Sequence, residues 1–258
     1  MSKHRTIYYN MRTKCITSAK SKSRKKNAES DDLISVILLC DSPGHRMRSY
    51  GPVSLVSVNG AVRLIDLQIE AIKSTFNNFE IILCLGFDSD KVYRYIRSKH
   101  KDLNIRIVEN QLYDTSNSCE SLRLSLKNIC NDKVLICDGN LIIDSKLLSN
   151  LSISTSSIMV EENPNNTLEI GLNIDNNIVQ HFSFGAKNIW SEIIYLNGKP
   201  MIDNLVKILL NHDNKNRLMF EALNELLSAN AANKFQVIKN PFQLTKINNV
   251  KTYHNIKG

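Results

Sequence analysis

Residues 33–40 read Leu-Ile-Ser-Val-Ile-Leu-Leu-Cys, an apolar run of strand length, and the polar loop Asp-Ser-Pro-Gly-His-Arg follows directly at 41–46. Aliphatic and β-branched side chains without regular polar alternation are typical of a strand buried on both faces, as in a parallel sheet. Runs of the same kind occur at 79–85 and 133–137. The intervening segments are long enough for helical crossovers, so the pattern predicts parallel central strands.

Helical periodicity fills the segments between these runs. Within residues 59–75, Ile65, Ile69 and Ile72 recur at three- and four-residue spacing, which predicts an amphipathic helix. Two further helices are predicted at 88–99 and 118–129, with another strand at 104–109. Strands that alternate with helices predict an α/β fold, a Rossmann-like, mostly parallel sheet with helices on both faces.

The regular alternation of strands and helices ends after about residue 143. Short strands are predicted at 156–160, 168–174 and 178–184, separated by asparagine-rich turns that favour antiparallel hairpins. Helices at 201–210 and 216–227 and a strand at 235–238 follow. We therefore expect a small mixed α+β part to extend the α/β part, with residues 33–258 forming one domain.

The positive charge of the chain is concentrated at its N-terminal end. The formal charge is +8, from 33 Lys and Arg against 25 Asp and Glu, and nine of the basic residues lie within 1–28, which hold no acidic residue. The remainder has 24 basic and 25 acidic residues, so its own charge is −1. Residues 1–32 are predicted to be a flexible basic tail. This tail is either a solvated segment without a partner, a contact for nucleic acid or another anionic surface, or an organellar targeting peptide.

The cysteines and the apolar runs indicate the compartment. None of the six cysteines forms a Cys-x-x-Cys pair, and no secretory signal precedes the first strand. We expect unpaired thiols in the cytoplasm or another reducing compartment. No apolar run reaches the roughly 18 residues of a membrane helix, so no membrane span is expected. The oligomeric state stays open.

The loop after the first strand carries the first candidate site. In an open α/β sheet, ligands bind outside the carboxyl ends of the strands. Gly44 allows the backbone to approach a phosphate, and the Arg46 guanidinium pairs with phosphate oxygens. At the end of the 133–137 strand, Asp138 precedes a glycine, which is a usual place for a metal ligand. The loop is therefore a candidate phosphate site beside a candidate metal site.

Four blocks of sequence, in order, resemble the nucleotidyltransferases that join a nucleoside triphosphate to a sugar phosphate or phosphocholine. The blocks are Gly44-x-Arg46-Met47 with residues 51–72, residues 108–117 with Ser121-Leu122, residues 135–140, and residues 220–224. The last block is similar to the closing helix of short phage- and capsule-type members. The resemblance covers residues 33 to about 250 and implies a GT-A-like fold.

The resemblance also implies roles for individual residues. It implies nucleotide binding by Ser42, Gly44, His45 and Arg46, catalytic roles for Arg46 and Asp138, Mg²⁺ ligation by Asp138 and Asn140, and acceptor binding by Asn117, Ser121, Glu221 and Asn224. The implied reaction uses Mg²⁺ and a triphosphate, CTP for example, and an acceptor phosphate attacks the α-phosphate in line.

Purely structural roles are the alternative for several of these side chains. Asn117 directly precedes a predicted helix, where it would serve as an N-cap. Glu221 lies on an amphipathic helix and would then be a solvated face residue. Trp190, the single tryptophan, is interpreted as a packing residue beside other apolar side chains.

Three positions depart from the family pattern. Val53 stands where these enzymes carry a lysine, Asn140 replaces the metal-binding aspartate, and Asp41 places a carboxylate beside the expected phosphates. Losing one preorganised cation typically costs about 10²–10³-fold in rate. The alternative hypothesis is therefore an inactive protein that keeps the fold as a binding or structural module, with the basic tail as its contact.

Overall fold

The computed structural model describes residues 33–58, 60, 62–241 and 244–257, so the predicted basic tail lies outside the described residues. The first half of the domain contains the predicted parallel strands. They are β5 (Ile105–Glu109), β4 (Phe79–Leu85), β1 (Ile34–Cys40) and β6 (Lys133–Asp138), in that order across the sheet. β1 lies between β4 and β6 and is parallel to both. Every residue of β1 is buried, as its unbroken apolar pattern predicts.

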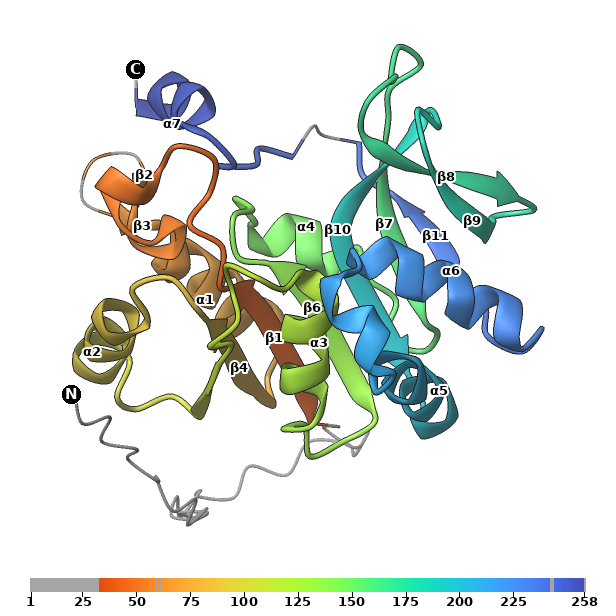
Figure 1. Cartoon of the computed structure of the whole chain (residues 1–258), viewed down its shortest axis with the longest axis horizontal. Helices are drawn as coiled ribbons and strands as arrows, with labels where there is room; N and C mark the ends of the chain where they lie inside the picture. The colour runs from red at the N-terminus through yellow and green to blue at the C-terminus, as the bar shows by residue number, and fades with distance from the viewer. Residues whose placement is uncertain (1–32, 59, 61, 242–243, 258) are drawn as a thin grey trace, which may run out of the picture. The chain divides into compact units, whose positions relative to one another are not determined.

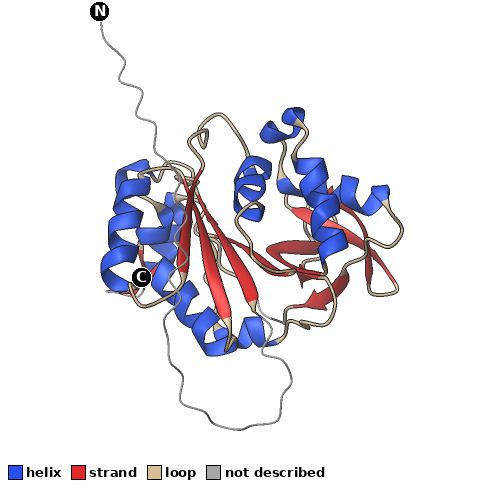
Figure 2. Ribbon diagram, turned by 90° about the horizontal axis from the view of Figure 1, so that it is seen from below, coloured by secondary structure: helices blue, strands red, loops and turns tan. Residues whose placement is uncertain are grey.

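Helices cover both faces of these strands (Figure 2). They are α1 (Leu64–Thr75), α2 (Ser89–Lys99), α3 (Ser118–Leu126), α4 (Ser145–Ser149), α5 (Lys199–Leu209) and α6 (Met219–Ala229). Because strand side chains alternate between faces, Val36 packs with α1, α2 and α4, whereas Ile37 packs with α3, α5 and α6. The first helix begins at Leu64, five residues later than predicted.

The second half corrects the expectation of a mostly parallel sheet. Its strands are β7 (Ser157–Glu162), β8 (Ile170–Asp175), β9 (Ile178–Phe184), β10 (Asn188–Asn197) and β11 (Gln236–Lys239). β10 runs antiparallel to β6 and β7, and it also pairs with β8, which closes β10, β7, β11, β9 and β8 into a ring. The nine-stranded sheet is therefore mixed. The turn at 175–177 makes the predicted antiparallel hairpin of β8 and β9. The turn at 163–166 does not, because β7 pairs with β10 and β11 and β8 pairs with β9 and β10.

The C-terminal segment returns to the loop after β1. The loop is followed by the short helices η1 (Arg48–Tyr50) and η2 (Val53–Leu55) and by the strands β2 (Ser57–Val58) and β3 (Val62–Arg63), and the C-terminal segment contains α7 (Val250–Lys257). A third short helix, η3 (His212–Asn216), joins α5 to α6. Figure 1 shows α7 beside β2 and β3, and Tyr253 of α7 packs in one apolar cluster with Met47 and Val58. His45 N donates to Asn248 O at 2.8 Å, so the loop after β1 is hydrogen-bonded to this segment.

Within the described part of the chain, no helix combines the length and apolar character needed to cross a membrane.

Candidate functional site

The candidate site lies at the carboxyl ends of β1 and β6. Leu39 and Asp138 are paired in the parallel register, and Gly139 N donates to Leu39 O at 2.8 Å. A Cβ at Gly139 would come within 2.5 Å of Cys40 Sγ and 2.6 Å of Leu39 O. Only glycine allows the chain after β6 to approach the end of β1 this closely.

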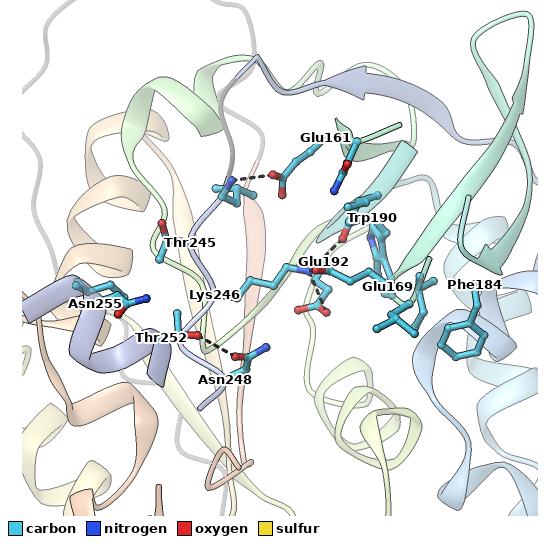
Figure 3. Close-up of a pocket in the computed structure, with 16 residues that line it drawn as sticks. Glu161, Glu169, Phe184, Trp190, Glu192, Thr245, Lys246, Asn248, Thr252 and Asn255 are labelled. Atoms are coloured by element: carbon cyan, nitrogen blue, oxygen red, sulfur yellow. Dashed lines mark hydrogen bonds and ion pairs between the residues drawn. The ribbon is translucent and has the colours of Figure 1, made fainter. Parts of the chain in front are cut away.

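Two cavities lie at these strand ends, and a third lies beside them. A cavity of about 120 Å³ lies under the loop after β1, and it is lined by Ser42, Gly44, His45, Val53, Asp138, Asn140 and Asn248, among others. A second, of about 390 Å³, is lined by residues that include Asp41, Tyr113, Asn117, Asp138, Asn140, Trp190 and Glu192. A third, of about 710 Å³, opens between the ring of strands and the C-terminal segment, and its lining includes Glu161, Glu169, Phe184, Trp190, Glu192 and Lys246 (Figure 3). Asp138 and Asn140 line the first two, and Glu192 lines the second and third, so the cavities are contiguous.

Asp41 is held by a local hydrogen-bond network. Ser121 Oγ donates to Asp41 Oδ2 at 2.6 Å, and Asn110 Nδ2 donates to the same oxygen at 3.4 Å. Burial raises the pKa of the Asp41 carboxyl, and these hydrogen bonds only partly offset that rise. Ser121, predicted to bind the acceptor, is therefore engaged with Asp41.

Asp41→Asn is expected to stabilise the protein at pH 8 and to leave its stability unchanged near pH 4. The folded protein holds this proton to a higher pH than the unfolded chain does, so stability falls as pH rises above the ordinary pKa of 3.8. Asparagine removes that loss and still accepts the Ser121 hydrogen bond. Urea unfolding of both proteins at the two pH values measures the difference, and an equal midpoint shift at both would contradict it.

Asp138 lies in a partly buried group of carboxylates. Burial raises its pKa well above the ordinary value, and the neighbouring Glu192 and Asp41 carboxylates raise it further, whereas Lys246 opposes them. Glu192 adopts φ 58° at the irregularity in the pairing of β10 with β7. Few residues other than glycine adopt this conformation, and such strain is concentrated at functional sites. The bulge turns Glu192 into the cavities.

Glu192 and Lys246 are the site residues that sequence reasoning missed. Lys246 Nζ lies 3.4 Å from Glu192 Oε1 and 4.0 Å from Glu169 Oε2, and it donates to Trp190 O at 3.3 Å (Figure 3). No motif marks either residue, because Glu192 interrupts an otherwise apolar strand and Lys246 lies in an irregular segment. Their only local signal is a charged side chain next to apolar neighbours.

Three of the four predicted nucleotide-binding residues line a cavity, and the fourth does not. Ser42, Gly44 and His45 line the smallest cavity together with Val53. Gly44 has φ 71°, and a Cβ there would meet Val53 Cγ2 at 2.9 Å, so both the turn and the space require glycine. Arg46 is exposed and is absent from the described lining residues of the three cavities.

The predicted acceptor-binding residues are mostly engaged in structural bonds. Asn117 is the N-cap of α3, where its side chain accepts from Ser118 N at 3.0 Å, and it also lines the second cavity. Glu221 accepts from Leu218 N at 2.8 Å at the start of α6. Asn224 exchanges two hydrogen bonds with the Phe182 backbone and so fastens α6 to β9.

The donor set beside Asp138 suits a hard divalent cation. Asn140 Oδ1 and Glu192 Oε2 are buried and make no hydrogen bond, although both residues line the second cavity with Asp138. Carboxylate and amide oxygens are the ligands that Mg²⁺ prefers. Over the described residues, no group of three His, Cys, Asp or Glu is placed to hold a metal, so the set depends on the Asn140 amide.

The fold is similar to that of solved nucleotidyltransferases. The chain matches the CTP:phosphocholine cytidylyltransferase of Streptococcus pneumoniae with a TM-score of 0.69 at 19% identity, over 87% of this chain and 97% of that one. It matches the inositol-1-phosphate CTP transferase of T. maritima with a TM-score of 0.66 at 12% identity, over 86% and 94%. HddC from Yersinia pseudotuberculosis, complexed with GMP-PN, matches with a TM-score of 0.61 at 17% identity, over 86% and 97%.

No family model and no curated protein matches the sequence. The structural matches, all at low sequence identity, confirm the predicted resemblance to nucleotidyltransferases at the level of the fold alone.

Proposed function

We propose that the protein transfers a nucleotidyl group from a nucleoside triphosphate to a phosphorylated small molecule, with Mg²⁺. The observation that carries the proposal is the position of Asp138, Asn140 and Glu192, whose oxygens border contiguous cavities at the strand ends of a nucleotidyltransferase fold. One of these cavities would take the triphosphate and the largest would take the acceptor.

The reaction needs positioning and charge neutralisation more than covalent chemistry. An acceptor phosphate oxygen bonds to the α-phosphorus, while the bond from that phosphorus to the oxygen bridging to the β-phosphorus breaks and pyrophosphate leaves with the electron pair. Asp138, Asn140 and Glu192 would hold Mg²⁺, which neutralises phosphate charge when bound. The backbone around Gly44 would orient the phosphates, and Arg46 would contact them from the exposed side of the loop.

The lining of the largest cavity favours an acceptor with a cationic group. Glu161, Glu169 and Glu192 supply more negative charge than the one ammonium of Lys246 offsets, and Trp190 and Phe184 supply aromatic rings. Carboxylates and aromatic faces together attract quaternary or primary ammonium groups. A phosphocholine-type acceptor therefore fits this cavity better than a sugar phosphate, whose sugar group carries no positive charge.

The test is an assay of pyrophosphate release by the full chain with each of the four ribonucleoside triphosphates and Mg²⁺. Phosphocholine, phosphoethanolamine and glucose 1-phosphate serve as acceptors. We expect release that requires both substrates and is fastest with a cationic acceptor. A folded protein that releases no pyrophosphate with any pair, and shows no heat of binding with any nucleotide, would refute the proposal.

A second candidate function is nucleotide binding without catalysis. It is favoured by Val53, which forms a buried wall of the smallest cavity where the resemblance implies a lysine. Such a protein would act as a binding module, with residues 1–32 contacting nucleic acid or another anionic partner. Measurable heat of nucleotide binding without pyrophosphate release would support this candidate over the enzyme.

A further inference from the structure

The three cavities contain very little fixed positive charge. Over the described lining residues, Lys246 is the only lysine or arginine, and His45 is the only other basic side chain. A triphosphate or an acceptor phosphate that enters the site would meet carboxylates from Asp41, Asp138 and Glu192. Among the lining residues, the charge of Lys246 is therefore the main attraction for a phosphate group.

We propose that Lys246 is the fixed cation of this site, which contacts substrate phosphate and competes with the divalent cation for the carboxylates around Asp138. The inference rests on the proposed function for its phosphate contact, whereas its competition with the metal can be measured without nucleotide.

The geometry gives Lys246 a defined position. Its side chain is 17% exposed, and three acceptors restrain its ammonium: Glu192 Oε1, Glu169 Oε2 and the Trp190 carbonyl. Figure 3 shows the side chain extending from the C-terminal segment across the cavity to these groups. An ammonium held in this way loses little conformational entropy when it binds a ligand.

The surrounding charges predict opposite effects on the two kinds of ligand. Glu161, Glu169, Glu192 and Asp138 lie around one lysine, so the cluster stays negative with Lys246 present. Removing the ammonium makes the cluster more negative, which strengthens its attraction for a divalent cation and its repulsion of phosphate. A purely structural lysine would instead weaken both ligands together when it is replaced.

The fluorescence of Trp190 can report ligand binding to this site. Trp190 is the only tryptophan in the chain, and it lines the cavity next to Lys246. Mn²⁺, a paramagnetic substitute for Mg²⁺, is titrated while Trp190 fluorescence is followed. CTP and ATP are titrated separately in EDTA. The variants are Lys246→Met, Lys246→Gln and Lys246→Arg, with Lys239→Met as the matched control, because Lys239 is exposed and 3.9 Å from Glu162 outside these cavities.

We expect Lys246→Met and Lys246→Gln to bind Mn²⁺ about tenfold more tightly and metal-free nucleotide about tenfold more weakly, from the loss of one nearby charge. Lys246→Arg keeps the charge, so its affinity for each ligand should remain within about threefold of that of the unmodified protein. Lys239→Met should bind both ligands as the unmodified protein does. Thermal unfolding establishes that each variant is folded. If Lys246→Met does not fold, the affinities of Lys246→Gln test the proposal.

Unchanged or weakened Mn²⁺ binding in folded Lys246→Met and Lys246→Gln would overturn the competition. Unchanged nucleotide binding in these variants would overturn the phosphate contact. If the unmodified protein binds no nucleotide, the proposed function and the phosphate contact fail together, whereas tighter Mn²⁺ binding in the variants would still establish the competition.

Discussion

Asp138→Asn is expected to lower the rate of pyrophosphate release by at least about 10²-fold, the usual cost of losing one charged group that acts on the reacting phosphates. The carboxylate lies at the end of β6 where two cavities meet, and asparagine offers the metal a neutral oxygen in its place. Asn140 N donates to Asp138 Oδ1 at 3.2 Å, a bond that asparagine can keep. The loss of activity should therefore come from the missing carboxylate charge and not from a disturbed local structure.

The same substitution is expected to stabilise the fold at neutral pH. Burial and the carboxylates of Glu192 and Asp41 raise the pKa of Asp138, so keeping it ionised costs folding free energy. Lower activity together with a higher urea midpoint would separate a functional loss from misfolding. Asp144→Asn is the matched control, because Asp144 caps α4 through Leu147 N and asparagine caps equally well. Similar activity losses in both variants would contradict the role given to Asp138.

Arg106→Met is expected to destabilise the protein by about 3–5 kcal/mol, the usual cost of leaving a buried charge without its partner. Glu80 is 2% exposed on β4, and Arg106 Nη2 on β5 donates to Glu80 Oε2 at 3.1 Å. Arg106 also donates to the Asn128 carbonyl through Nη1. The variant would therefore leave both a buried carboxylate and a carbonyl oxygen poorly satisfied.

Urea unfolding followed by circular dichroism measures this change, and Glu80→Gln/Arg106→Met is its control. Glutamine keeps an oxygen that accepts from Ser35 Oγ, which now donates to Glu80 Oε1 at 2.6 Å, and it carries no charge. The double variant should recover most of the lost stability. If it is as unstable as Arg106→Met alone, lost packing rather than the unpaired carboxylate explains the effect.

The parallel half of the fold could be predicted because each strand carries its own signal. β1, β4 and β6 are continuous apolar runs, and their burial on both faces follows from that pattern. β10 was not predicted, because Ser191 and Glu192 interrupt its apolar pattern before residues 193–196. Closure of the ring could not be predicted either, since it depends on pairs distant in sequence, such as Asn188 with Leu172.

A site residue could be predicted only where the local sequence also marks the end of a strand or the start of a helix. Asp138 follows a strand and precedes a glycine, and Asn117 caps α3 as its place before the helix indicates. Trp190 is buried and packs edge-on against Phe182, which confirms its interpretation as a packing residue, although it also lines two cavities. Lys246 lies more than 100 residues from Asp138, so only the folded chain brings their charges together.

Closure of the ring of strands also affects whether the sheet can pair with strands of other chains. An open sheet exposes unpaired backbone groups along two edge strands, and each can accept a strand from a neighbouring chain. Here β8 pairs back onto β10, so within the described part of the nine-stranded sheet only β5 remains as an edge. That strand is five residues long and carries Arg106 and Glu109, and short charged edges resist amyloid-like strand addition. The closed ring thus halves the number of edges that must be protected against aggregation.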